Sequence, residues 1–210
     1  MTMTLTKSPR SARKAKGDGH LRRAEILHAA ERIFVRDGYQ GATIRKIAEE
    51  VGVSSTALYM HFSDKDEILL EICEGAIATL LASNTAISER SIDAVSLVRL
   101  MLDAYMRFGL DNPNTYQLAF CTTPGQISAI RHEATTGLGV RCYERFVGAV
   151  ADIAAEGRLR VGDADSAAQT LWAACHGLVS LRTSQKIERA DDETLMALML
   201  DCLFEGLVID

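Results

Sequence analysis

The chain is poor in the residues that mark several protein classes. Its 210 residues include only three prolines and one tryptophan, and its five cysteines form neither a CxxC pair nor a Cys/His cluster. An odd number of cysteines, scattered among apolar helical neighbours, argues against a disulfide scaffold and is typical of reduced core residues. No apolar run approaches the roughly 20 residues of a membrane-spanning helix, and the basic start lacks the apolar region of a signal peptide. We therefore expect a cytoplasmic protein that makes no contact with a membrane.

Sequence signatures of enzymes are also missing. The chain contains no nucleophile elbow, no phosphate-binding glycine loop and no HExxH motif. Glu49 and Glu50 are adjacent on a predicted helix, so their carboxylates diverge and cannot act as a pair. The five histidines do not fall at the spacing of metal ligands. We therefore predict no catalytic activity, no cofactor and no bound metal.

The charge is unevenly distributed along the chain. The net charge is −5, but residues 1–70 carry 12 Lys and Arg against 9 Asp and Glu, whereas residues 71–210 carry 11 against 19. A basic N-terminal part on an acidic remainder favours nucleic-acid binding through the basic part. Residues 1–20 are rich in basic residues and lack apolar periodicity, so we predict a disordered basic tail there.

The most informative stretch is residues 43–65. Thr43 is a candidate N-cap, and Gly52 ends the helix that follows it, because glycine adopts a positive φ at little cost. The apolar face of that helix is expected to be Ile44, Ile47, Ala48 and Val51. Ser54 then caps a second helix, 54–61, which is too short to be stable without packing. That packing is expected from Ala57 or Leu58, and Phe62. Two short helices joined by a tight turn predict a helix-turn-helix.

The remainder of the sequence keeps a helical period. A helix is predicted over 21–37, ended by Gly38, and another begins at Ser63 or Asp64 and continues for more than about 20 residues. Further helices are predicted over 91–110, 114–121, 126–156, 163–185 and 191–207. Gly137 or Gly139 could interrupt the third of these. Because no strand alternation appears, the fold class is predicted to be all-α.

The N-terminal residues, taken together, resemble the DNA-binding domain of the TetR family of transcriptional repressors. The match covers roughly residues 21–70 without a gap and includes Ala29-Ala30, Phe34, Gly38-Tyr39, Thr43, Ile47-Ala48, Gly52-Val53-Ser54, Leu58-Tyr59, His61-Phe62, Lys65 and Leu69-Leu70. An unrelated helical hairpin is the alternative, but it gives no reason for Tyr-x-His-Phe followed by a lysine at a helix start. The resemblance implies three parts: the tail 1–20, a helix-turn-helix domain 21–66, and a ligand-binding and dimerisation domain 67–210.

The resemblance also implies which side chains meet DNA. Contacts to the phosphate backbone are expected from Thr43, Tyr59, His61 and Lys65. Contacts to base edges are expected from Arg45, Ser55, Thr56 and Ala57, with Tyr59 sharing this role. Ser54, which caps the same helix, is also expected to contact DNA. For Tyr59 the alternative is a ring packed in the core with its hydroxyl at the surface.

In the C-terminal part, residues 171–182 (LWAACHGLVSLR) stand out. Trp172 and His176 share a helix face, and the Trp-x-x-x-His-Gly pattern is similar to a C-terminal domain in one branch of TetR-like regulators. That resemblance implies a ligand pocket, in which His176 contacts the ligand or a partner subunit; alternatively, it is a core histidine satisfied by a neighbour. The residues expected at the pocket are Met101, Tyr105, Phe108, Tyr116, Phe120, Cys121, Tyr143, Trp172 and His176. For most of the apolar and aromatic ones, the alternative of a plain core residue is favoured.

The resulting prediction is a homodimeric repressor. It binds a pseudo-palindromic double-stranded DNA operator and is released by a small lipophilic effector. The last two predicted helices carry apolar residues over wide arcs, which favours a dimer interface formed by them. Two alternatives stay open: a redox or metal sensor on the same scaffold that uses Cys121, Cys142 or Cys175, and an enzyme or scaffold that merely carries a helix-turn-helix.

Overall fold

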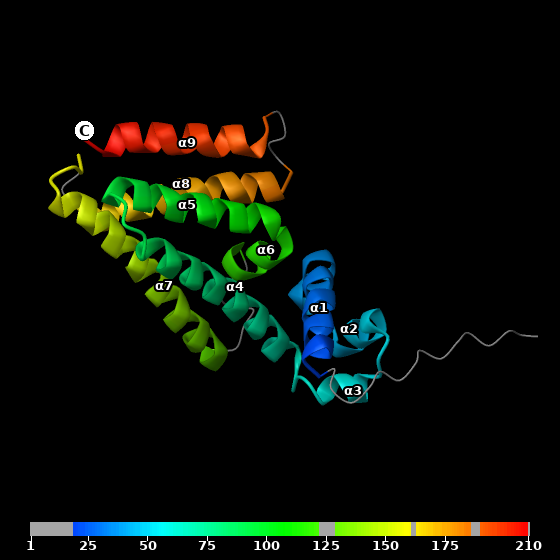
Figure 1. The fold of residues 1–210 in the computed structure, drawn as a ribbon. Helices are drawn as coiled ribbons and strands as arrows, with labels where there is room; N and C mark the ends of the chain where they lie inside the picture. The colour runs from blue at the N-terminus through cyan, green and yellow to red at the C-terminus, as the bar shows by residue number, and fades with distance from the viewer. Residues whose placement is uncertain (1–18, 122–128, 161–162, 186–189, 210) are drawn as a thin grey trace, which may run out of the picture. The chain divides into compact units, whose positions relative to one another are not determined.

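The computed structural model describes residues 19–121, 129–160, 163–185 and 190–209, and only the backbone of 129–136. Within these ranges every regular element is a helix, apart from an isolated bridge between Leu159 and Val208 (Figure 1). The all-α prediction is therefore confirmed. The chain divides into two compact units, Met1–Ile68 and Leu69–Asp210. The predicted disordered tail lies almost entirely outside the described residues.

The first unit contains three helices and the start of a fourth. They are α1 (Gly19–Gly41), α2 (Ile44–Val51), α3 (Ser55–Tyr59) and the first residues of α4 (Lys65–Ser88). Gly38 has φ 70°, which interrupts α1 at the position where the sequence predicts its end. The buried residues of this unit include Ile26, Ala30, Ile33, Ile47, Leu58 and Phe62.

The helix-turn-helix is held by local caps. The Thr43 hydroxyl accepts from the amide of Lys46 at 3.2 Å, and Gly52 ends α2 in the left-handed region with φ 74°. Ser54 caps α3 by accepting from the amide of Ala57 at 3.1 Å. A helix of five residues has too few internal hydrogen bonds to persist alone, so α3 depends on the packing of Leu58, which is completely buried.

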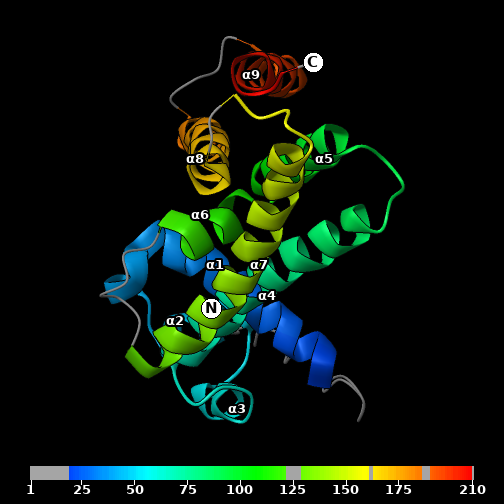
Figure 2. The same cartoon turned by 90° about the vertical axis from the view of Figure 1, so that its left-hand side faces the viewer.

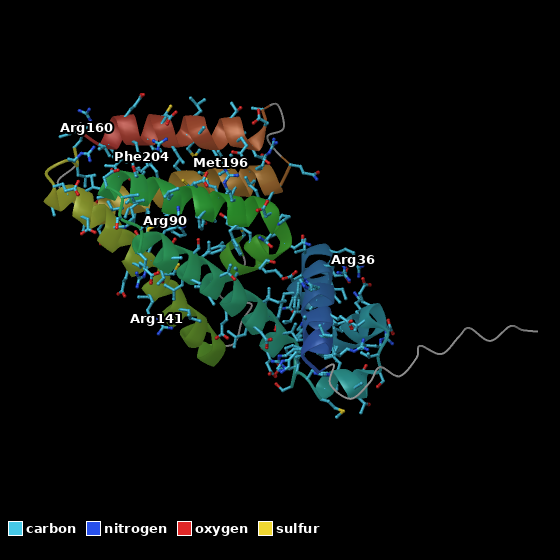
Figure 3. All side chains as sticks on the ribbon, viewed as in Figure 1. Arg36, Arg90, Arg141, Arg160, Met196 and Phe204 are labelled. Atoms are coloured by element: carbon cyan, nitrogen blue, oxygen red, sulfur yellow. The ribbon has the colours of Figure 1, made fainter. Side chains whose placement is uncertain are left out.

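The described part of the second unit contains the remainder of α4 and five further helices. They are α5 (Ala94–Asp111), α6 (Pro113–Cys121), α7 (Ala129–Ala155), α8 (Ala164–Thr183) and α9 (Asp192–Leu207). Helix α5 packs against α6, α7, α8 and α9, and α7 also packs against α8 (Figure 2). From α9, Met196 and Phe204 point into this core (Figure 3). Helix α7 continues through Gly137 and Gly139, so neither glycine interrupts it.

The close approach of α5 to its neighbours depends on Gly109. A Cβ at this position would lie 2.5 Å from Val179 Cγ1 of α8 and 2.8 Å from Tyr116 Cδ2 of α6. Contacts this short are not tolerated, so only glycine lets the three helices meet here. The Tyr116 ring packs against Gly109 and is completely buried.

Helix α4 corrects the expectation that no helix is long and apolar enough to span a membrane. By length and composition alone it is long and apolar enough to cross a membrane. Its apolar side chains, however, are core residues: Ile68 is buried in the first unit, and Leu69, Ile72 and Leu80 are buried in the second. A core helix of this kind passes the same test, so α4 does not indicate a membrane protein.

Candidate functional site

The exposed face of α3 is the first candidate site. Thr56 is exposed, Ser55 and Ala57 are half-buried, and the Tyr59 side chain is 56% exposed, which places its ring on the surface rather than in the core. The neighbouring Met60 is 84% exposed. A short helix with small, polar and aromatic side chains on its open face can offer them to base edges in a major groove.

Two further predicted DNA contacts lie at the N-terminus of α2. Thr43 and Arg45 are both exposed, and the Arg45 side chain keeps 80% of its surface accessible. Its Nε lies 3.8 Å from the Glu49 carboxylate one turn later, which is a weak, solvent-exposed pair. Thr43 and Arg45 are therefore placed where a phosphate or a base could reach them.

Lys65 is more constrained than the sequence suggests. Its ammonium donates to the carbonyl oxygens of Tyr39 at 2.8 Å and Ala42 at 3.3 Å, and it lies 4.0 Å from the centre of the Tyr39 ring. The Tyr39 hydroxyl in turn donates to Asp66. This ammonium therefore ties the start of α4 to the end of α1, and its contact with phosphate stays a prediction.

His61 also has a structural role through its backbone. Its side chain is half-buried, and its carbonyl accepts from the Arg23 guanidinium, which lies 4.0 Å from the centre of the Phe62 ring. Arg23 also approaches Glu67 at 3.6 Å. The contribution of Arg23 was missed in the sequence, because nothing in the spacing of residues 23, 61 and 67 marks them as neighbours.

Within residues 19–68, every lysine and arginine already has a partner. Six of them face carboxylates: Arg22 with Glu25, Arg23 with Glu67, Arg32 with Glu50, Arg36 and Lys46 with Asp37, and Arg45 with Glu49. Arg36 and Lys46 together hold the pKa of Asp37 well below its usual value through hydrogen bonds to its carboxylate. The basic charge of this unit is thus arranged in pairs at its surface.

The second candidate site is a cavity of about 470 Å³ inside the second unit. Helices α4 to α8 all contribute to its wall, which is mostly apolar and aromatic. Of the residues expected at a ligand pocket, five line this cavity: Met101, Tyr105, Phe120, Tyr143 and Trp172. Its other lining residues are Ile77, Leu80, Asn84, Leu102, Ala119, Gly139, Cys142, Phe146 and Gln169.

The other four expected residues do not line the cavity. Phe108 packs against the core, and Cys121 is exposed at the end of α6, with its Sγ 3.9 Å from the Ser180 hydroxyl. Tyr116 and His176 lie behind Tyr105 in a hydrogen-bonded chain. These four residues lie outside the cavity wall, and their contact with a ligand stays a prediction.

That chain connects three helices. The hydroxyls of Tyr105 (α5) and Tyr116 (α6) are 2.9 Å apart, and the Tyr116 hydroxyl lies 2.6 Å from His176 Nδ1 on α8. Burial raises the pKa of Tyr116 to about 12, although hydrogen bonds to Tyr105 and Ser180 oppose this, and burial also raises the pKa of Tyr105. Burial lowers the pKa of His176. At neutral pH the chain is therefore uncharged, and it joins the cavity wall at Tyr105 to α6 and α8.

Two of the three cysteines considered for a sensor, Cys142 and Cys175, are partly or wholly shielded from solvent, whereas Cys121 is exposed. Burial raises the pKa of Cys175 to about 12 and also raises the pKa of Cys142, so neither forms a reactive thiolate readily at neutral pH. In the part of the chain that the structure describes, no group of three or more His, Cys, Asp or Glu residues could hold a metal ion.

Two sequence profiles match the chain. One, described as "Bacterial regulatory proteins, tetR family", matches residues 26–72, and another, described as "Tetracyclin repressor-like, C-terminal domain", matches residues 98–203. The chain belongs to the TetR family. It is a DNA-binding transcription regulator with a helix-turn-helix, and its similarity to such regulators supports a role other than that of an enzyme. The narrower resemblance based on Trp172 and His176 stays a prediction.

Two curated proteins resemble the chain in sequence, and a solved structure resembles it in fold. The HTH-type transcriptional repressor AcnR of Corynebacterium diphtheriae is 42% identical over 67 residues, which cover 30% of this chain and only 35% of AcnR. The nucleoid occlusion factor SlmA of Escherichia coli is 28% identical over 179 residues, covering 81% of this chain and 88% of SlmA. The crystal structure of a tetR-family regulatory protein from Rhodococcus RHA1 superposes with a TM-score of 0.80 at 20% identity, covering 90% of this chain and 98% of that one.

One polar residue of the cavity in this TetR protein, Asn84, was not predicted from the sequence. Asn84 lies on the buried face of α4, between Leu80 and Ile87, and is only 9% exposed. A signal for it was present, because an amide on an otherwise apolar helix face is uncommon and needs a partner. The Tyr143 hydroxyl is likewise buried without a hydrogen-bond partner among the described residues.

Proposed function

We propose that this protein is a ligand-responsive repressor that binds a pseudo-palindromic operator as a homodimer and is released by a small lipophilic effector. The observation that carries this proposal is the cavity of about 470 Å³ in the unit that follows the helix-turn-helix. A cavity of this size, with apolar walls and a few polar groups, is typical of small-molecule sites. In this proposal residues 21–66 bind DNA, and residues 67–210 bind the ligand and form the dimer.

Exposed apolar side chains on the last two helices support the dimer. Leu181 of α8 is 44% exposed and Leu198 of α9 is 58% exposed. Cys202 on α9 is exposed as well. Pairing α8 and α9 with their copies across a two-fold axis would bury these side chains in a four-helix interface. Two copies of α3 could then meet two half-sites, which accounts for the pseudo-palindromic operator.

The response to a ligand would begin at Tyr105. Its ring lines the cavity, and its hydroxyl belongs to the hydrogen-bonded chain with Tyr116 and His176. A ligand that displaces Tyr105 therefore changes the bonds that hold α5, α6 and α8 together. Helix α4 lines the same cavity and continues into the first unit. A ligand that favours one arrangement of these helices over another would lower the affinity for DNA, and DNA would lower the affinity for the ligand by the same factor.

The proposal is tested by selecting bound DNA from a random pool and measuring its affinity by fluorescence anisotropy. We expect a two-fold-related sequence, a dimer in sedimentation at micromolar concentration, and loss of sequence preference in Thr56→Ala. Thr79→Ala, at an exposed threonine on α4 that does not line the cavity, is the matched control and should bind DNA as the parent does. A chain that binds no selected DNA, or one that is monomeric on its operator, would show the proposal to be wrong.

A further inference from the structure

We infer that the cavity is built for an uncharged lipophilic molecule with a single hydrogen-bonding group, such as a ketone or an alcohol, which pairs with the amide of Asn84. This inference rests on the proposed function, because it takes the cavity to be the effector site. It goes further by naming the chemical class of the ligand and the residue that selects it.

The described wall of the cavity offers no charge that could compensate a charged ligand. Among the described residues, none of those that line it carries a formal charge: its members with a polar group are Asn84, Tyr105, Cys142, Tyr143, Gln169 and Trp172. An ion that enters an apolar cavity loses its water and needs an opposite charge to replace it. Neither a carboxylate nor an ammonium group would find such a partner among the described lining residues.

Asn84 supplies a site for a polar, uncharged group. The only hydrogen bond of its amide to the described residues is a long contact from Nδ2 to Cys142 Sγ, at 3.9 Å. Its Oδ1 accepts no hydrogen bond from these residues, yet it is not among the fully enclosed atoms without a partner. That oxygen is therefore still accessible, and Asn84 itself lines the cavity. A buried amide with unused hydrogen-bonding capacity is costly, which makes a ligand its natural partner.

The neighbouring Tyr143 strengthens the argument. Its hydroxyl is completely enclosed and has no hydrogen-bond partner among the described residues, and its ring packs 5.9 Å from the centre of the Trp172 ring in the same wall. The wall around Asn84 thus holds two polar groups whose hydrogen bonds are incomplete. A core that served packing alone would gain stability from apolar side chains at both positions.

The test uses the full-length protein and three probes with equal chains: 2-decanone, decanoate and decylamine. Binding is followed without DNA through the emission of Trp172, the only tryptophan, which lines the cavity. We expect 2-decanone to bind at least about ten-fold more tightly than either charged probe at neutral pH, because neither charge is compensated. Equal or tighter binding of decanoate or decylamine, or no binding of 2-decanone, would overturn the inference.

The role of Asn84 is tested by Asn84→Leu, which has nearly the same shape but no amide. The affinity for 2-decanone should fall roughly three- to ten-fold, as for one lost hydrogen bond, while p-xylene, which has no polar group, should bind at least as well. The variant without ligand should melt at the same or a higher temperature. A purely structural asparagine would instead lower the melting temperature and weaken both probes, and that result would contradict the inference.

Asn114→Leu on α6 is the matched control, because this asparagine does not line the cavity and its replacement should leave both affinities unchanged. Release of operator DNA is measured separately. If 2-decanone binds with the predicted preference but does not release DNA, the ligand class stands and the proposed regulation fails. If a charged probe releases DNA while 2-decanone does not bind, the regulation stands and the ligand class is wrong.

Discussion

The two units place their functional residues in opposite ways. In the first unit the candidate DNA contacts are exposed side chains on α2 and α3, and the caps that shape these helices join residues three apart, as in Thr43 with Lys46. In the second unit the candidate site is an interior cavity, and its contacts join residues as distant as Asn84 and Cys142. The first site is therefore shaped by local caps and held by the packing of Leu58, whereas the whole wall of the second site comes from how separate helices pack.

The largest expected effect comes from removing the packing that holds α3. Leu58 is completely buried, and Leu58→Ala should destabilise the first unit by about 2–5 kcal/mol, because it leaves a cavity under a helix of five residues. We expect DNA binding to be lost on every sequence while 2-decanone still changes the Trp172 emission. Leu21→Ala, at a side chain that is 62% exposed, should bind DNA normally. Loss of ligand binding in Leu58→Ala would show that the units are not independent.

The converse experiment perturbs only the second unit. Gly109→Ala would bring a methyl group to 2.5 Å from Val179 and should cost about 1–3 kcal/mol of stability, seen as a lower melting temperature. Ligand binding should weaken because α5 lines the cavity. In Gly148→Ala the new Cβ meets no atom of the described residues within 4 Å, so this control should be neutral or slightly stabilising. An unchanged melting temperature for Gly109→Ala would contradict the packing described here.

Leu58 and Gly109 also show which features of the structure can be predicted from the sequence and which cannot. Leu58 was expected to pack because it follows a cap on a short helix, and Gly52 was expected to end α2 because its position needs a positive φ. Gly109 carries no such local signal: it lies inside a regular helix, and only the positions of Val179 and Tyr116 explain it. For the same reason the sequence suggested several cavity residues by type but could not show that His176 lies behind Tyr105.

A smaller effect should appear as a dependence of stability on pH. Burial holds the pKa of His176 below its ordinary value of 6.5, so the unfolded chain takes up a proton more readily than the folded one. Stability should therefore fall as the pH drops below about 6.5, by less than about 1 kcal/mol because this side chain is only partly buried. Denaturant unfolding at several pH values should show this trend.

Substituting two histidines separately tests whether His176 causes this loss of stability at lower pH. In His176→Gln the decline just below neutral pH should become shallower, whereas His28→Gln, at an exposed histidine of the first unit, should behave as the parent. A decline that is unchanged in His176→Gln would mean that another group is responsible.

The smallest expected effect concerns the surface of the first unit. Glu49 lies 3.8 Å from Arg45, and Glu49→Gln should raise the affinity for operator DNA roughly two- to five-fold by freeing the arginine and removing a negative charge. Glu89→Gln, an exposed glutamate of the second unit, makes the same charge change and should have little effect. If both variants bind alike, the local pairing of Arg45 does not matter for DNA.

The pairing of every described cation in residues 19–68 has a consequence for how this surface exchanges ions. When a free cationic side chain meets DNA, it releases a counterion from the phosphates, and affinity then falls steeply with added salt. Here an arginine such as Arg45 must first leave Glu49, and the carboxylate left behind attracts a cation from solution. The cation that the protein takes up thus offsets part of the counterions that the phosphates release. The slope of log affinity against log salt should accordingly be shallower than the number of phosphate contacts alone would give.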